Sequence, residues 1–215
     1  MARLFPKWTD TAFKVVLGGL GAGAVGGLTL VMLYMRTPYG EAAEYPIDQP
    51  VQFDHRHHVE DDQIDCRYCH SGAERSSYAG IPATEVCMGC HNQVWNQSPM
   101  LEPVRRSYFS GEALEWNRVH HVPDFVYFNH SIHVNKGVGC VSCHGRVDQM
   151  ALDYQVAPLT MGWCLDCHRN PEPNLRPQSQ ITSMTWTAEQ DPKGHEQAVT
   201  EYNVRHLTNC TTCHR

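Results

Sequence analysis

All ten cysteines of this 215-residue chain fall into one repeated pattern. Two residues separate the members of each pair, and a histidine follows the second cysteine directly. The five motifs are Cys66, Cys69 and His70; Cys87, Cys90 and His91; Cys140, Cys143 and His144; Cys164, Cys167 and His168; and Cys210, Cys213 and His214. No cysteine is left over for a disulfide, so the fold must accommodate five such units at once.

The spacing of each motif has a chemical reason. Two cysteines three residues apart on a tight helical turn lie on the same face, where each can form a thioether to a haem vinyl group, and the adjacent histidine can reach the iron. Cys-x-x-Cys-His is the attachment signature of c-type haem. One copy alone could be half of a zinc site, but five copies that use every cysteine exclude that interpretation. The sequence predicts five covalently attached c-type haems with proximal ligands His70, His91, His144, His168 and His214.

The rest of the composition agrees with a core built from haem. Only 41% of the residues are hydrophobic, and the chain contains 14 histidines. A chain this polar would bury too little aliphatic surface to offset its ordering entropy. We therefore expect a mainly α and irregular multihaem cytochrome c domain, with short helices at the motifs and stacked haems as its core. The net charge of −6 argues against a nucleic-acid partner, because nucleic-acid binding favours a basic face.

An uncharged stretch of 21 residues from Val15 to Met35 precedes this domain. At the helical rise it is long enough to cross the hydrocarbon layer of a membrane. Basic residues precede and follow it: Arg3, Lys7, Lys14 and Arg36. The three basic residues before the stretch outweigh Asp10 and predict a cytoplasmic N-terminus. The sequence thus predicts a single-pass protein of the cytoplasmic (inner) membrane with its haem domain on the periplasmic side.

A cleaved signal peptide is the alternative for this segment. Its apolar region is usually about 7–15 residues and ends in a small-residue cleavage site. The apolar run is longer here, and no clean site follows it. Gly19, Gly23 and Gly27 recur at four-residue steps, a pattern that permits close packing against a partner helix.

Prolines and a repeat divide the chain into an anchor over residues 1–36, an extended linker over 37–52 and a pentahaem domain over 53–215. Phe53-Asp-His-Arg-His-His58 precedes the motifs at 66 and 87, and Phe128-Asn-His-Ser-Ile-His133 precedes those at 140 and 164. The spacing predicts duplicated two-haem modules at 53–91 and 128–168, with a fifth haem at 210–214. Residues 171–205 carry no motif, and a solvated loop or a partner-binding segment is equally consistent with their composition.

The Phe-x-His-x-x-His element resembles that of the small class III multihaem cytochromes. In that family its two histidines are distal ligands of different haems. The resemblance implies that His55, His58, His130 and His133 are distal iron ligands.

A fifth distal ligand is needed if every iron has six ligands. His120 is favoured because it precedes the second Phe-x-His element, and Met161, Met150 and His206 are alternatives, since thioether ligands also occur in cytochromes c. Met100 and Met184 also lie outside the anchor and the motifs. For His57, His121, His195 and His206 an exposed side chain is the simpler expectation.

Several stretches together resemble one particular family. They are Ile81–His91, Val119–His130, Cys140–Met150 and Pro158–Arg169. They are similar to the pentahaem cytochrome subunit of alternative complex III, a bacterial quinol-oxidising complex. The resemblance implies electron relay to a periplasmic carrier or a monohaem cytochrome c subunit. It also implies a large iron–sulfur subunit and polytopic quinol-oxidising membrane subunits as partners.

Two other functions compete with this relay. A stand-alone membrane quinol dehydrogenase also has one N-terminal anchor, but the related family carries four haems. Pentahaem nitrite reductases typically have a lysine-ended motif at the active haem, whereas all five motifs here end in histidine. We therefore expect no enzyme activity of the chain on its own.

Overall fold

The computed structural model describes residues 5–41 and 43–214, which separate into two units with a boundary between Ala43 and Glu44. Helices and irregular segments make up both units. Apart from one isolated antiparallel bridge between Val138 and Leu175, the described residues contain no β structure. This architecture confirms the expected mainly α and irregular fold.

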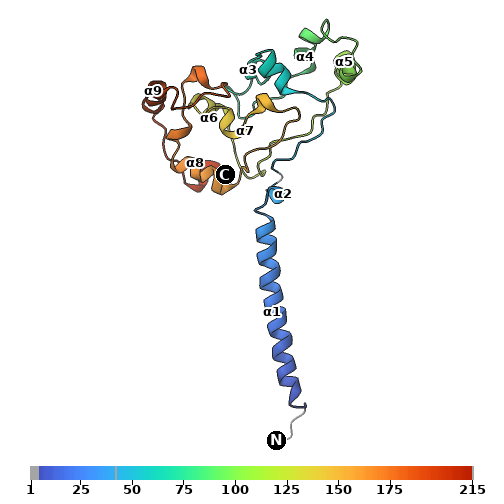
Figure 1. Cartoon of the computed structure of the whole chain (residues 1–215), viewed down its shortest axis with the longest axis vertical. Coiled ribbons are helices and arrows are strands. Elements are labelled where there is room, and N and C mark those ends of the chain that lie inside the picture. Colours follow the sequence, from blue (N-terminus) through green and yellow to red (C-terminus); the bar gives the residue numbers. More distant parts are fainter. Residues whose placement is uncertain (1–4, 42, 215) are drawn as a thin grey trace. The chain divides into compact units, whose positions relative to one another are not determined.

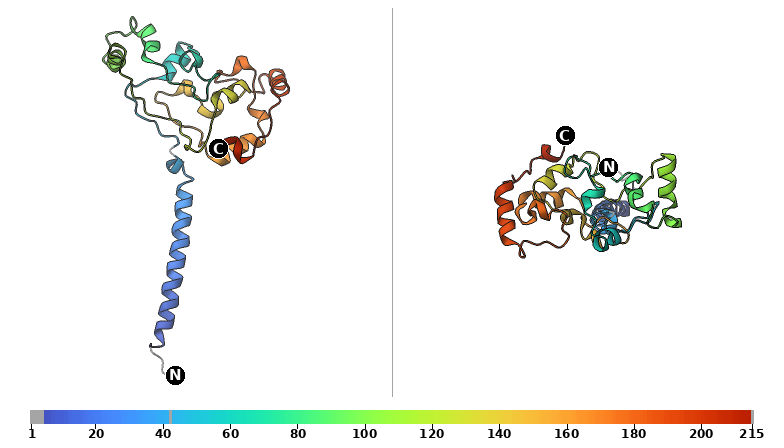
Figure 2. Two further views of the ribbon diagram at one scale, coloured as in Figure 1. Left: turned by 180° about the vertical axis from the view of Figure 1, so that it is seen from behind. Right: turned by 90° about the horizontal axis from the view of Figure 1, so that it is seen from above.

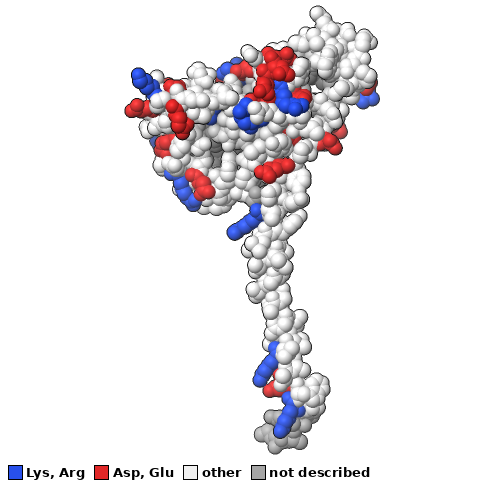
Figure 3. Space-filling model, in the orientation of Figure 1, with Lys and Arg blue, Asp and Glu red and all other residues white. Residues whose placement is uncertain are grey.

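The first unit contains the long helix α1 (Trp8–Tyr34) (Figure 1). Its 27 residues extend about 40 Å at the helical rise, against about 30 Å for the hydrocarbon layer. Its mean hydropathy is 1.9, and within the described residues it is the one helix long and apolar enough to span a membrane. Residues 15–34 of α1 include no charged side chain, and the face of the helix in view is uncharged along this part (Figure 3).

A short helix, α2 (Pro38–Glu41), lies where the sequence predicts an extended linker. Proline is well suited to the first position of a helix, and the Thr37 hydroxyl oxygen accepts a hydrogen bond from the Gly40 amide at 3.4 Å. Gly40 also lies against the backbone of Tyr34 and Met35, where a Cβ would clash. The linker is thus helical at its start and irregular from residue 43 to residue 52.

The second unit consists of short helices joined by long irregular segments. Its α-helices are α3 (Cys66–Cys69), α4 (Thr84–His91), α5 (Glu102–Ser110), α6 (His130–Asn135), α7 (Val141–His144), α8 (Met161–Arg169), α9 (Pro192–Tyr202) and α10 (Cys210–Cys213). A π-helix covers Arg56–Asp61, and 3-10 turns cover Pro99–Leu101, Val147–Gln149, Glu172–Asn174 and Gln178–Gln180. The helices α5 and α9 lie at opposite ends of this domain in all three views (Figures 1 and 2).

Each of the five motifs lies on its own helix, namely α3, α4, α7, α8 and α10. Side-chain caps begin two of them, because a cap oxygen satisfies an amide that has no partner within the helix. Asp65 accepts a hydrogen bond from the Arg67 amide at the start of α3. Thr160 accepts one from the Trp163 amide at the start of α8. The starts of α3 and α8 are therefore encoded locally.

The aliphatic core of the chain is small. Ten hydrophobic side chains among the described residues are buried, and three of them are alanines. One cluster joins Val51, Met88 and Val104 and holds α4 against α5. This core is too small for a domain of this length, as expected for a fold whose interior is completed by haem.

Residues 171–205, which carry no sequence motif, are folded and partly buried. Leu175 and Ile181 are each only 1% exposed. Helix α9 begins at a cap, because the Asp191 carboxylate accepts a hydrogen bond from the Gly194 amide at 3.0 Å. Proline follows that cap at the first helical position, a recognisable start signal. The segment packs against Gly137, which has a φ of +82° and no room for a side chain beside Tyr202.

Candidate haem-binding sites

The five motif histidines share one orienting contact, a hydrogen bond at Nδ1. In four of them the partner is a backbone carbonyl oxygen: His70 to Gly80 at 2.6 Å, His91 to Val94 at 3.0 Å, His168 to Leu207 at 2.8 Å, and His214 to Phe125 at 3.0 Å. A metal-binding histidine almost always donates its second ring N–H in this way, which fixes the tautomer and the ring orientation. The arrangement leaves Nε2 as the ring nitrogen directed to an iron.

His144 is the exception, because its Nδ1 lies 3.2 Å from Nε2 of His120. The two rings meet edge to face, with centroids 4.2 Å apart and an interplanar angle of 67°. Burial lowers the pKa of His120 to about 4 and that of His144 to about 3, so both imidazoles are neutral at pH 7. The expectation that His120 is a distal ligand does not fit this contact, because its Nε2 faces a proximal histidine.

Three of the histidines expected as distal ligands lie opposite a motif histidine. The ring centroids are 6.1 Å apart for His58 and His91, 6.4 Å for His130 and His144, and 6.1 Å for His133 and His168. Metal–nitrogen bonds of about 2 Å on both sides of an iron, plus the half-width of each ring, place two imidazole centres about 6 Å apart. Each pair therefore has the spacing needed to hold one haem iron.

The two Phe-x-His-x-x-His elements have the same local geometry. Phe53 stacks on His58 at 4.3 Å, and Phe128 stacks on His133 at 4.6 Å. The first histidine of each element lies edge-on to the same phenylalanine, at 4.8 Å for His55 and 4.7 Å for His130. In both copies the second histidine also bonds the backbone carbonyl four residues earlier, at 2.9 Å from His58 to Asp54 and 2.8 Å from His133 to Asn129. One phenylalanine thus orients two imidazoles in each copy.

His55 lies beside His70, the proximal histidine of the first motif. Burial, together with the nearby His70 imidazole, lowers the pKa of His55 to about 4. Its Nδ1 is buried and has no hydrogen-bond partner within the protein. A buried polar atom left unpaired is costly, and this unpaired imidazole beside a motif histidine is a candidate distal ligand.

The thiols place the five motifs in a definite spatial order. Cys69 of the first motif interacts with Cys87 of the second, which raises the pKa of Cys69 in addition to the effect of burial. Cys66 of the first motif interacts with Cys140 of the third, which raises the pKa of Cys66 and lowers that of Cys140. The first motif therefore lies between the second and the third.

Thiols of the third, fourth and fifth motifs are likewise close to one another. Burial raises the pKa of Cys143 to about 12, and the neighbouring thiols Cys167 and Cys164 of the fourth motif add to the effect. Burial likewise raises the pKa of Cys164, and Cys213 of the fifth motif raises it further. The order in space is second, first, third, fourth, fifth, and Figure 1 shows α4, α3, α7 and α8 following one another across the domain in this order.

The two ends of this order are more accessible than its middle. Cys90 of the second motif and Cys210 of the fifth are exposed, whereas the other eight cysteines are partly buried. Groups bound at the second and fifth motifs would therefore lie nearest to solvent and to partner proteins.

The remaining candidate side chains have other surroundings. His57 lies between the carboxylates of Asp61 and Asp62, and His206 Nε2 is 2.8 Å from Glu172. Met161 and Met100 are more than half exposed, while Met150 is buried. The expectation of an exposed His195 is not met.

His195 is partly buried on α9, and its Nδ1 bonds the Leu175 carbonyl at 2.9 Å. It therefore has the orienting contact of the proposed ligands, although it lies in a segment without a motif. Its position next to the helix start signal at Asp191 and Pro192 is the one hint that the sequence offers.

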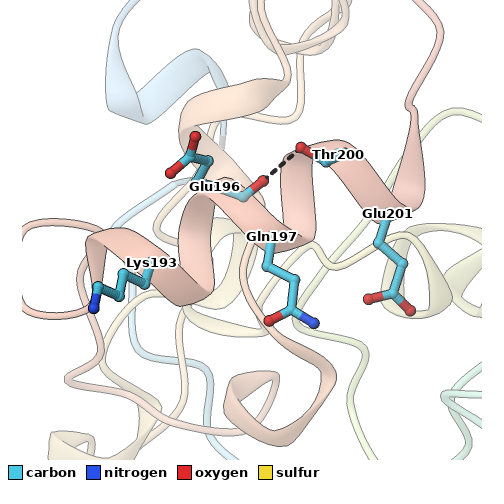
Figure 4. Close-up of a pocket in the computed structure, with 5 residues that line it drawn as sticks. All are labelled: Lys193, Glu196, Gln197, Thr200 and Glu201. Carbon is cyan, nitrogen blue, oxygen red and sulfur yellow. Dashed lines mark hydrogen bonds between the residues drawn. The ribbon is translucent and has the colours of Figure 1, made fainter.

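A surface pocket on α9 is separate from these sites. Lys193, Glu196, Gln197, Thr200 and Glu201 line it (Figure 4), and all five come from one face of the helix. No cysteine or histidine is among these lining residues, so the pocket offers no ligand to a haem iron.

Comparison with known proteins agrees with the motif geometry. Residues 126–215 match the sequence model of the family described as cytochrome c7 and related cytochrome c. The chain is also 33% identical over 132 residues to the multihaem cytochrome c subunit of a menaquinone reductase from Nitratidesulfovibrio vulgaris (strain Hildenborough). That alignment covers 61% of this chain and 61% of the relative. The chain thus contains a mainly helical, cytochrome c7-like multihaem domain, and its five Cys-x-x-Cys pairs bind five c-type haems.

Proposed function

We propose that the chain is the pentahaem electron-transfer subunit of a membrane quinol:acceptor oxidoreductase of the alternative complex III type. The observation that carries the proposal is the unbroken spatial order of five haem motifs, accessible at both ends. Closely packed haems supply one-electron transfer at their irons. The protein holds the haems in this spatial order, orients their axial ligands and excludes water from the central haems.

We assign as axial ligands the histidine pairs whose imidazole rings lie opposite each other. His58 and His91 hold the second haem, His130 and His144 the third, and His133 and His168 the fourth, in accordance with their 6.1–6.4 Å ring spacings. His55 serves the first haem opposite His70. These four irons, each closed on both sides by imidazole, have no position for a substrate, which favours relay over catalysis.

The partners follow from the resemblance and from the relative. The anchor α1 is proposed to cross the cytoplasmic membrane with the haem domain on its periplasmic side, because basic residues precede the apolar stretch. A large iron–sulfur subunit, polytopic quinol-oxidising subunits and a monohaem cytochrome c are the proposed partners. Because the relative is named a subunit of a larger enzyme, a subunit role is also favoured over a stand-alone quinol dehydrogenase.

Affinity purification of the tagged full-length chain from detergent-extracted membranes tests this proposal. We expect the iron–sulfur and polytopic subunits to co-purify, and the complex to reduce a soluble cytochrome when quinol is added. The separated chain is expected to accept electrons from small donors without oxidising quinol. Quinol turnover by the separated chain would refute the subunit role.

The menaquinone reductase relative also favours a second function, in which electrons flow through the haems towards quinone. The two functions differ in direction. Incubation of the purified complex with a reduced cytochrome and menaquinone would produce menaquinol in the second case. No menaquinol, together with rapid quinol oxidation, is expected if the first proposal holds.

A further inference from the structure

The third haem motif differs from the other four in the hydrogen-bond partner of its proximal histidine at Nδ1. The motif histidines of the other four each bond a backbone carbonyl, whereas His144 Nδ1 meets the side chain of His120 at 3.2 Å. Metal binding by His144 through Nε2 requires its proton on Nδ1, so His144 is the donor. His120 Nε2 is then the acceptor, and its own proton lies on Nδ1.

The backbone around His120 keeps this acceptor in place. The Arg118 guanidinium donates a hydrogen bond to the His120 carbonyl at 3.1 Å. The His121 amide bonds the side-chain oxygen of Gln155 at 3.1 Å, and Gln155 is only 5% exposed. The segment that carries this imidazole is therefore braced locally by Arg118 and tied to the core through Gln155.

An imidazole nitrogen is a more basic acceptor than an amide carbonyl. A stronger acceptor on the far nitrogen of a metal-bound histidine makes that histidine a stronger electron donor to the metal. Increased donation stabilises the oxidised iron more than the reduced iron, so it lowers the reduction potential. Hydrogen bonding to the axial ligands is one of the means by which proteins adjust haem potentials.

We propose that His120 is a positioning residue of the third haem, which accepts the Nδ1 proton of His144 and lowers the reduction potential of that haem. The inference rests on the ligation of the third haem by His144 and His130 under the proposed function. Because the third motif is central in the order of five, His120 affects transfer between the two haems on one side and the two on the other.

Redox titration of the full-length holoprotein, followed by haem absorbance and EPR, tests the role of His120. In His120→Ala we expect five attached haems with the same spin states as in the unaltered protein, and one reduction equilibrium shifted about tenfold towards the reduced form, or about 59 mV for a one-electron couple. His120→Gln supplies an amide acceptor and should give a smaller shift in the same direction. His57→Ala, which removes a histidine that faces the carboxylates of Asp61 and Asp62, should leave this reduction equilibrium unchanged.

The readouts separate this inference from the ligation on which it rests. An additional high-spin haem in His120→Ala would show that His120 is itself a ligand and would overturn the inference. Unchanged potentials in both His120 variants would also overturn it. His130→Ala should produce one additional high-spin haem; if the spin states stayed unchanged in that variant, the proposed ligation would fail and the inference with it.

Discussion

Phe53 and Phe128 show how one aromatic ring can hold two ligands. Each stacks on one histidine and meets the other edge-on, so one ring sets the relative orientation of two imidazoles. The opposed pairs His58–His91 and His133–His168 have the same 6.1 Å spacing and interplanar angles of 65° and 60°. Equivalent positions should therefore respond equally to substitution.

Replacement of His58 or His133 with Ala should convert one low-spin haem into a high-spin haem, because the iron loses a strong-field nitrogen. EPR of the purified holoprotein measures the change, and haem content should stay at five. His57→Ala is the matched control, since His57 lies beside His58 and faces two carboxylates. A low-spin spectrum in His58→Ala would contradict the ligand assignment.

The short motif helices depend on their caps and on long-range contacts. Asp65 caps α3 through the Arg67 amide at 2.8 Å. It also accepts a hydrogen bond from Thr182 at 3.0 Å, and so joins the first motif to the segment at 171–205. Hydrogen bonds from the Arg67 side chain chiefly lower the pKa of Asp65 to about 2.

Asp65→Ala should lower the free energy of unfolding by about 1 kcal/mol, the usual cost of losing a helix cap. Because its pKa is lower in the folded state than the unfolded value of about 3.9, this contribution is present at neutral pH. It should disappear as the pH falls from about 4 to about 2. Chemical denaturation followed by circular dichroism measures it, and Asp61→Ala on the exposed surface is the control. An equal decrease in the free energy of unfolding in both variants would refute the capping role of Asp65.

The helix α1 is expected to remain in the mature protein as an anchor. Protease added to sealed spheroplasts should digest the haem domain and leave an N-terminal fragment protected, because the basic residues before α1 favour the cytoplasmic side. Mass analysis of the mature chain distinguishes this outcome from signal-peptide cleavage. A mature chain that begins after residue 36 and is soluble would contradict the anchor.

The molecule as a whole uses its cofactors as its core. Few side chains are buried, and the thiols of neighbouring motifs contact or approach each other throughout the domain. Charged side chains of both signs are spread over the face of the haem domain in view (Figure 3). The central third motif interacts with motifs on both sides, whereas the fifth interacts with the fourth.

Loss of the central third haem should therefore destabilise the domain more than loss of the terminal fifth haem. Cys210→Ala with Cys213→Ala should give a folded protein with four haem increments instead of five by denaturing mass analysis. Cys140→Ala with Cys143→Ala removes a haem from the interior and should leave the domain sensitive to protease. Equal protease resistance of the two variants would contradict the spatial order of the motifs.

Features that are encoded locally could be predicted from the amino-acid sequence alone. Attachment of five haems follows from Cys-x-x-Cys-His, and the apolar composition of residues 15–35 predicts the long helix α1. The stacking of Phe53 on His58 is also local, since these residues are five apart. The folded segment at 171–205 escaped prediction, although Asp191 and Pro192 mark the start of α9.

Tertiary contacts decide instead which motifs are neighbours. They also decide which group forms a hydrogen bond with each motif histidine. The first motif lies between the second and the third because Cys66 meets Cys140 and Cys69 meets Cys87. His120 contacts His144 across 24 residues, and the Phe125 carbonyl orients His214 across 89. Such contacts form only when distant segments close on one another, and no local pattern of residue types encodes that closure.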